Sequence, residues 1–292
     1  KAGSSLAMAA SVQVYIKNAA EFAAMNEVYR TFWKADPPAR TTIVSDFVIP
    51  NALVEISVIA IPNGGERKVI HPSSWMKSPN PYSYGIKSGS TLFMAGLVAR
   101  NGKDNSAVEG SMAVQTKAVL DNAAAILQEA GMTFDNVVSS KVFITDATKF
   151  QEMNETYRTA FVKDPPARAT VVAPLMSAAN SVEIALTASS LPKQVFTTPA
   201  ADGTPGKPSP LLSSAVKVGN RLYLSGLLGN TPANKGDTEA QTVEILARVG
   251  RTLKVAGFDW PDLADGVVYI TDTNNFAAMN KGYTSVVKAL PA

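Results

Sequence analysis

Residues 154–172 read NETYRTAFVKDPPARATVV, and residues 26–44 read NEVYRTFWKADPPARTTIV. The two stretches begin 128 positions apart and share a Pro-Pro-Ala-Arg joint. Each predicts an amphipathic helix followed by a strand, and the helix must end at the paired prolines because proline cannot continue a helix interior. A chain that repeats such a pattern contains tandem copies of one folding unit, so the repeat decides the fold.

Further alignment extends the repeat to three copies of about 127 residues. Three segments align without a gap, each opening on Ala-Gly and closing on Met-Asn: residues 2–26, 130–154 and 256–280. We expect their glycines, Gly3, Gly131 and Gly257, to occupy equivalent positions. The predicted domains are the C-terminal half of a unit over 1–62, a complete unit over 67–192 and a unit without its last two strands over 195–292. We also expect the chain to be part of a longer one, because half a unit buries too little surface to offset its ordering entropy.

The middle unit predicts the architecture. Its apolar patterns indicate strands over 90–99, 139–145, 167–175 and 181–189, and helices over 111–130 and 150–161. A short hairpin precedes them, and the order β-α-β-α-β-β is typical of an α+β layer with two helices on one face of a mixed sheet.

Composition excludes several chemistries. The chain has no cysteine, which rules out disulfides, thiolate nucleophiles and thiolate metal ligands. The single histidine, His71, cannot form a ligand cluster and is expected to be structural, so we expect no metal and no cofactor. A net charge of +3 over 292 residues weighs against a nucleic-acid surface.

The hydropathy pattern weighs against a membrane protein. Apolar runs fall well short of the roughly 20 residues that a membrane span needs. Residues 4–11 (SSLAMAAS) lack the basic region and the apolar core of a signal peptide, so we expect a cytoplasmic location.

Three motifs occur in a fixed order: Met-Asn-x-x-Tyr on the second helix, Pro-Ala-Arg-x-Thr at the joint and Val-Glu-Ile on the final strand. With these motifs, nearly the whole chain resembles the YjgF/RidA family, also labelled L-PSP endoribonuclease. The resemblance implies chorismate-mutase-like α+β units, which form homotrimers around a central barrel with pockets in the clefts between subunits. We therefore expect the tandem units to form a trimer-like ring within one chain.

The resemblance also implies an activity, the cofactor-independent hydrolysis of enamines and 2-imino acids to 2-keto acids and ammonia. It assigns a carboxylate clamp to Arg168 and Arg40, since guanidinium is a planar fork that binds carboxylates through two hydrogen bonds. It assigns the orientation of water or the movement of a proton to Glu183 and Glu55. The remaining implied substrate-binding positions are Tyr82, Gly96, Asn154, Asn26, Gly226 and Asn280. We expect Arg168 to face Glu183 across a cleft between units.

The sequence departs from the family pattern in ways that keep other functions open. The family's Ser-Gly-Gln is Ala-Gly-Leu at 95–97 and Ser-Gly-Leu at 225–227, and Leu212 replaces the early tyrosine in the third unit. A more apolar pocket indicates a bulkier substrate or one inactive cleft. A non-catalytic small-molecule binding or regulatory protein is therefore an alternative, and an endoribonuclease is a third, although no histidine pair is present for RNA cleavage.

Taken without the resemblance, the same residues have simpler interpretations. Glu183 alternates with Val182 and Ile184, which is also typical of an outward-facing strand residue. Tyr29, Tyr157 and Tyr283 lie on apolar helix stripes and are predicted to be core residues.

Overall fold

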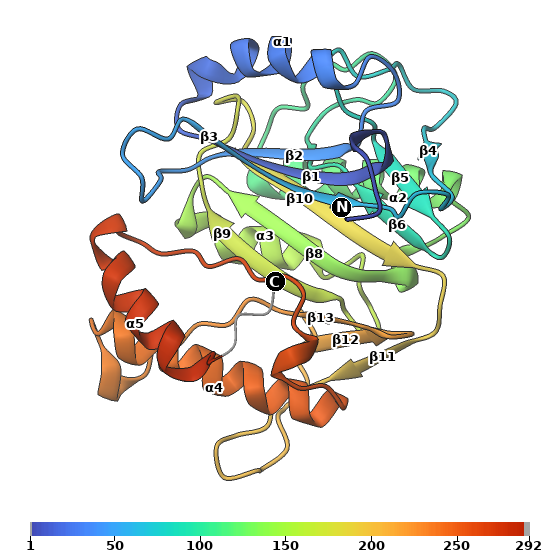
Figure 1. Ribbon diagram of the computed structural model, residues 1–292. Helices are drawn as coiled ribbons and strands as arrows, with labels where there is room; N and C mark the ends of the chain where they lie inside the picture. The colour runs from blue at the N-terminus through green and yellow to red at the C-terminus, as the bar shows by residue number, and fades with distance from the viewer. Residues whose placement is uncertain (1, 289–292) are drawn as a thin grey trace.

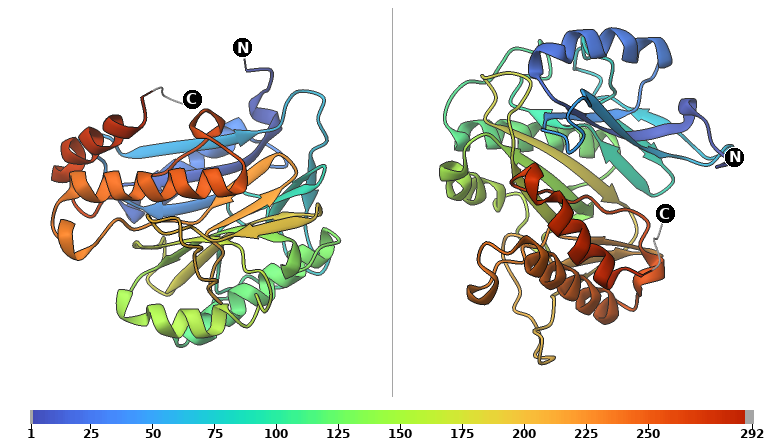
Figure 2. Two further views of the ribbon diagram at one scale, coloured as in Figure 1. Left: turned by 90° about the horizontal axis from the view of Figure 1, so that it is seen from below. Right: turned by 60° about the vertical axis from the view of Figure 1, so that its left-hand side comes forward.

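The protein, described here by a computed structural model over residues 2–288, has its strands in the middle and its helices on the outside (Figures 1 and 2). Three sheets succeed one another along the chain, and each has one or two helices on its outer face. No helix within the described range is both long enough and apolar enough to cross a membrane.

The first sheet has three strands in the order β2-β1-β3. Its strands are β1 (Ala9–Ile16), β2 (Ala39–Val44) and β3 (Val54–Ala60), and helix α1 (Phe22–Phe32) connects β1 to β2. β1 pairs with β2 in parallel, with Val12 opposite Arg40, and with β3 in antiparallel, with Tyr15 opposite Glu55. Every residue of β3 is exposed, because this repeat has no hairpin or first helix among its described residues to cover that edge.

The second sheet confirms the mixed α+β layer that the middle unit predicts. Its order is β4-β5-β6-β10-β8-β9, and the short β7 also pairs with β10. The strands are β4 (Lys68–Ile70), β5 (Gly85–Ser88), β6 (Thr91–Met94), β7 (Leu97–Val98), β8 (Val137–Ile144), β9 (Ala167–Val172) and β10 (Val182–Ser189). β8 and β9 are parallel, whereas β8 and β10 are antiparallel.

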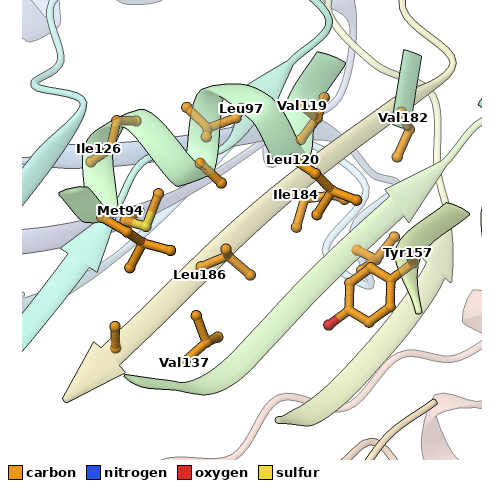
Figure 3. Packing of buried hydrophobic residues seen from close by; sticks show 14 of the residues in the cluster. Met94, Leu97, Val119, Leu120, Ile126, Val137, Tyr157, Val182, Ile184 and Leu186 are labelled. Carbon is orange, nitrogen blue, oxygen red and sulfur yellow. The ribbon is translucent and has the colours of Figure 1, made fainter. Parts of the chain in front are cut away.

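Two helices, α2 (Met112–Glu129) and α3 (Phe150–Tyr157), cover one face of this sheet. The Ser111 hydroxyl caps α2 by accepting a hydrogen bond from the Val114 amide at 3.3 Å. Apolar side chains of α2 face those of β10 across the largest core of the molecule (Figure 3). The residues labelled there include Val119, Leu120 and Ile126 of α2 and Ile184 and Leu186 of β10.

The third sheet is smaller. It contains β11 (Lys193–Phe196), β12 (Ala215–Val218) and β13 (Arg221–Leu224). Helix α4 (Thr238–Ala256) packs against β11 and β12, and α5 (Phe276–Val286) packs beside α4. Residues 263–270 align with β8 but form no strand, contrary to the expected match. β8 is held by hydrogen bonds to β9 and β10, and the described part of the third repeat offers no equivalents of those two strands.

The aligned glycines share one backbone conformation. Gly3, Gly131 and Gly257 have φ of +68°, +72° and +78°, in the left-handed region that favours glycine. Gly257 is the C-cap of α4, where the Phe258 amide donates to the Leu253 carbonyl at 2.9 Å and closes the helix end.

Equivalent aromatic residues bring the repeats together on the inner side. Tyr15, Phe143 and Tyr269 each follow their repeat's glycine by twelve positions. Tyr15 and Phe143 share an apolar cluster with Ile43, and the Tyr15 hydroxyl lies 3.3 Å from the Tyr269 hydroxyl. Segments of all three repeats therefore meet at corresponding residues.

We predict that Gly257→Ala lowers the free energy of unfolding by about 1–2 kcal/mol, because a Cβ is strained at this positive φ although nothing lies within 4 Å of it. Gly266→Ala is the matched control, since Gly266 is also in open space and has no left-handed φ. Urea unfolding of both variants measures the effect. Equal losses would contradict the assigned role of the backbone conformation.

Candidate ligand sites between repeats

The strand that carries the arginine of one repeat (β2 or β9, the arginine strand) is hydrogen-bonded to the segment that carries the glycine after β6 or β13 of the next repeat (the glycine turn). The Gly96 amide donates to the Arg40 carbonyl at 3.1 Å, and the Gly226 amide donates to the Arg168 carbonyl at the same distance. A second pair of bonds repeats the pattern, from Ser83 Oγ to the Pro37 carbonyl and from Ser213 Oγ to the Pro165 carbonyl, each 2.6 Å long. The chain thus builds one type of interface twice, and each copy contains one arginine.

Both arginines have the same aromatic surroundings. The Arg40 Cζ lies 4.8 Å from the centre of the Tyr29 ring, and the Arg168 Cζ lies 4.8 Å from that of Tyr157. The rings of Phe22 and Phe150 stand at 5.6 and 5.9 Å from the respective Cζ atoms. These rings stabilise a guanidinium through cation–π contact and hold its plane in place.

Both guanidinium groups are buried without an ionic partner in the described part of the chain. Arg40 and Arg168 are each only 4% exposed, yet among residues 2–288 neither has a carboxylate within ion-pair distance. Within the same range, Nη1 of both arginines and Nε of Arg168 have no hydrogen-bond partner. Buried charges are costly unless they are paired, so each arginine is prepared for an anionic ligand.

A cavity of about 320 Å³ lies beside Arg40. Arg40 comes from the first repeat, whereas Tyr82, Gly96 and Glu183 in the same wall come from the second. Tyr82 presents its ring 5.8 Å from the Arg40 Cζ. The cavity therefore has an arginine from one repeat and a carboxyl group from the next, in a volume suited to a small molecule.

The expectation that Arg168 faces Glu183 is wrong. Arg168 lies opposite Ser140 on β8, and Glu183 lies opposite Phe143 on the same strand. Side chains alternate between the two faces of a strand, so positions three residues apart point to opposite faces. Arg168 faces the helices beside Tyr157, and Glu183 shares its cavity with Arg40 instead.

Glu55 does not share a cavity with Arg40 either. It lies on the exposed strand β3 opposite Tyr15, and it is absent from the residues that line the cavity. An arginine and a glutamate of the same repeat are thus separated in both cases. A complete cleft needs the glutamate of the following repeat.

Glu183 has an environment that keeps it protonated. Burial raises the pKa of the Glu183 carboxyl to about 8, although the backbone of Thr42 and the positive charge of Arg40 act in the opposite direction. A Cβ on Gly96 would lie 1.9 Å from Oε1 of Glu183, so only glycine lets this carboxyl approach the turn. At neutral pH the group can therefore donate a proton or a hydrogen bond.

The three predicted asparagines differ in their placement. Asn26 and Asn154 are buried on α1 and α3, and Oδ1 of each has no hydrogen-bond partner. Asn26 also donates to Oδ1 of Asn80, a residue of the cavity wall, at 3.4 Å. Asn280 is half-buried on α5, where its carbonyl accepts a hydrogen bond from Thr284 at 2.9 Å.

The second interface differs in one aromatic side chain. Its glycine has an equivalent neighbour, because a Cβ on Gly226 would lie 3.0 Å from the Cβ of Ala169, as a Cβ on Gly96 would lie 3.0 Å from Thr41. Leu212 stands one residue before Ser213, as Tyr82 stands before Ser83. The Arg168 interface therefore lacks the phenol ring that the Arg40 interface contains.

Four aromatic residues belong to the site that were not among the predicted site residues. Tyr29 and Tyr157 are buried as predicted, but they also form the platforms on which the arginines stack, together with Phe22 and Phe150. The signal was present in the sequence, because each aromatic residue recurs at the same 128-residue spacing as the arginines.

Other polar groups have structural contacts. Nε2 of His71 lies 3.0 Å from the Trp75 carbonyl, and its ring packs beside Tyr84. No group of three or more histidine, aspartate or glutamate side chains within residues 2–288 is arranged to hold a metal ion.

Comparison with known proteins gives one family. The family model described as Endoribonuclease L-PSP matches residues 1–62, 73–190 and 207–292. A RutC family protein of Sulfurisphaera tokodaii is 36% identical over 110 residues, which cover 38% of this chain and 88% of that protein. The 2-iminobutanoate/2-iminopropanoate deaminase of Mus musculus is 32% identical over 118 residues, which cover 40% of this chain and 87% of that protein.

Among solved structures, RidA from an Antarctic Psychrobacter is 27% identical with a TM-score of 0.40, over 42% of this chain and 99% of that one. In each of these comparisons, less than half of the present chain matches nearly all of the other protein.

We predict that Glu183→Gln becomes progressively more stable than the native protein as pH rises. Below about 4.5 both side chains are neutral, whereas between about 4.5 and 8 the folded native protein retains a proton that the unfolded chain releases. The native protein should lose about 1.4 kcal/mol per pH unit relative to the variant in this window.

Chemical denaturation at pH 4, 6 and 8 measures the difference. Glu55→Gln is the matched control, because its exposed side chain carries no burial cost, and it should follow the native protein. A stability difference between Glu183→Gln and native that does not change with pH would contradict the protonated state assigned to Glu183.

Proposed function

We propose that this protein, which belongs to the YjgF/RidA (endoribonuclease L-PSP) family and carries the family unit in tandem, hydrolyses 2-imino acids to 2-keto acids and ammonia. The observation that carries the proposal is the joint placement of Arg40 and Glu183 in one cavity. Arg40 is a buried guanidinium with a free Nη1, and Glu183 is a buried carboxylic acid. The mouse deaminase, whose name states this activity, supports the choice of reaction.

The two groups suit successive steps of imine hydrolysis. Arg40 would hold the substrate carboxylate by paired hydrogen bonds, which fixes the adjacent C=N carbon in the cavity. Glu183 would protonate the imine nitrogen, so that water adds to that carbon and forms its C–O bond. The resulting carboxylate would take a proton from the added water and pass it to the amine nitrogen, so that the C–N bond breaks and ammonia leaves. It would then take the remaining hydroxyl proton as the C=O bond forms, which restores the acid.

The aromatic surroundings of Arg40 serve the same task. Tyr29 and Phe22 fix the guanidinium before any ligand arrives, so little conformational entropy is lost when a carboxylate binds. Tyr82 lines the cavity from the second repeat and places its ring 5.8 Å from the Arg40 Cζ.

The tandem repeats are proposed to form a trimer-like ring within one chain. The support is the recurrence of the same interface at Arg40–Gly96 and Arg168–Gly226, together with the contact of Tyr15 with its counterparts in the other repeats. Each interface then corresponds to the cleft between two subunits of a homotrimer, with a small-molecule carboxylate as its ligand.

A second function, ligand binding without turnover, is favoured at the Arg168 interface. Its arginine is as buried and as unpartnered as Arg40, which supports binding of a carboxylate. Leu212 occupies the position of Tyr82, so an aliphatic side chain replaces the phenol there. One interface would therefore hydrolyse its ligand while the other binds one.

We predict that Arg40→Lys lowers kcat/KM for a 2-imino acid by roughly ten- to hundred-fold, because lysine keeps the charge but loses the paired geometry, at a cost of about 1.5–3 kcal/mol. Arg168→Lys should leave most of the activity, and the double variant should match Arg40→Lys. Arg158→Lys, at an exposed arginine, is the control. The assay measures keto-acid formation from imines that an amino-acid oxidase generates.

Full activity in a folded Arg40→Lys, Arg168→Lys double variant would refute the arginine-clamped deaminase. Carboxylate binding would then have to be measured directly, by calorimetry, to test the binding function.

We also predict that kcat/KM falls as pH rises through about 8, because Glu183 must donate its proton to the imine nitrogen. Glu183→Gln should be strongly impaired and should lack this decrease. The measurement is the rate above the spontaneous hydrolysis at each pH from 6 to 9.5. A rate that instead increases through pH 8 would show that the carboxylate, and not the acid, is the active form.

A further inference from the structure

The cavity beside Arg40 contains a second arginine. Arg100 lines it together with Arg40, and Arg100 also lines a smaller recess that continues from it toward Trp75 and Asn122. Tyr82 and Gly96 border both spaces as well, so Arg100 lies where the two join. A ligand bound to Arg40 by one end can therefore extend toward Arg100.

Arg100 is held in position by its own loop. Its backbone forms an isolated bridge with Ala107, and its carbonyl accepts a hydrogen bond from Nδ2 of Asn122 at 2.6 Å. Its Nη1 donates to the Asn105 carbonyl at 2.9 Å. The side chain is half-buried, and among residues 2–288 no carboxylate lies within ion-pair distance of it. The guanidinium is thus anchored at one nitrogen, with donors left for a ligand.

The charges in this cavity do not balance. Glu183 is the acidic residue of its wall, and burial raises its pKa to about 8, so this carboxyl is mostly neutral at pH 7. Burial also raises the pKa of the Tyr82 hydroxyl, and that of Tyr84 in the recess to about 12, so neither supplies a negative charge. Both arginines therefore line one space in which no ionised carboxylate of residues 2–288 balances their charge. A ligand with one carboxylate would neutralise only one of them.

We propose that this cavity selects 2-imino dicarboxylates, with Arg40 binding the carboxylate next to the imine carbon and Arg100 binding the carboxylate of the side chain. The assignment rests on the deaminase proposed above for the reaction itself. A volume of about 320 Å³ accommodates a four- or five-carbon diacid, which is larger than the simplest imino acids.

The second interface provides a comparison within the same chain. Ser83 and Gly96 correspond to Ser213 and Gly226 at a spacing of 130 residues, and the same spacing places Asn230 at the position of Arg100. Asparagine carries no charge for a second carboxylate. The dicarboxylate preference is therefore assigned to the Arg40 cavity alone.

The test compares two substrates in the native protein and in Arg100→Gln. One is the imine of alanine, and the other is the imine of glutamate, each generated by an oxidase. In the native protein we expect a higher kcat/KM for the glutamate imine. Arg100→Gln should reduce that value roughly ten- to hundred-fold, while the alanine imine changes less than about twofold. Arg100→Lys keeps the charge and should retain part of the preference, and Asn230→Ala should leave it unchanged.

Binding of 2-oxoglutarate and 2-oxobutanoate, measured by calorimetry, separates this inference from the proposed activity. If neither imine is turned over but Arg100→Gln weakens 2-oxoglutarate alone, the deaminase is wrong and the role of Arg100 stands. If Arg100→Gln is folded by circular dichroism and affects both ligands equally, or if the native protein shows no dicarboxylate preference, the inference is overturned. If Arg100→Gln does not fold, the native protein and Arg100→Lys are compared instead. A dicarboxylate preference in the native protein that is smaller in Arg100→Lys supports the inference, and an equal preference in both overturns it.

Discussion

A backbone hydrogen bond from the glycine turn of one repeat to the arginine strand of the next is the contact on which the sites depend. It occurs twice with the same length, from Gly96 to Arg40 and from Gly226 to Arg168. Because it joins main-chain groups, it fixes where the arginine side chain begins relative to the neighbouring repeat, whatever the surrounding side chains are. The serine-to-proline bonds beside it leave little freedom for the two strands to slide.

This contact places a charged group where water is largely excluded. A guanidinium that is 4% exposed and lacks a carboxylate partner is unfavourable for folding, and stacking on Tyr29 or Tyr157 offsets only part of that cost. The protein contains this costly arrangement twice, which supports the ligand-binding role proposed for both arginines. Glu183 is a similar case, because a buried carboxyl group with a raised pKa destabilises the folded chain above its ordinary titration range.

Covalent linkage of the repeats has a consequence that a homotrimer cannot share. Identical subunits present identical clefts, whereas tandem repeats can change one cleft without the other. The two interfaces of this chain keep the arginine, the stacked aromatic rings and the backbone bonds. They differ at Tyr82 and Leu212 and at Arg100 and Asn230, and in the first interface these positions line the cavity. Specificity can thus diverge while the architecture is kept.

The sequence by itself determined the period of the repeat, the α+β unit, the family and the two arginines, because these depend on local patterns and on spacing along the chain. Only the tertiary structure decided that Glu183 joins Arg40 and not Arg168. That pairing depends on which face of β8 each neighbouring strand presents and on contact between different repeats. The tertiary structure also decided that residues 263–270 form no strand, since a strand needs hydrogen-bonded neighbours that no pattern within those residues reveals. Arg100 gained its place in the cavity from the folding of a loop, where no periodicity constrains the direction of a side chain.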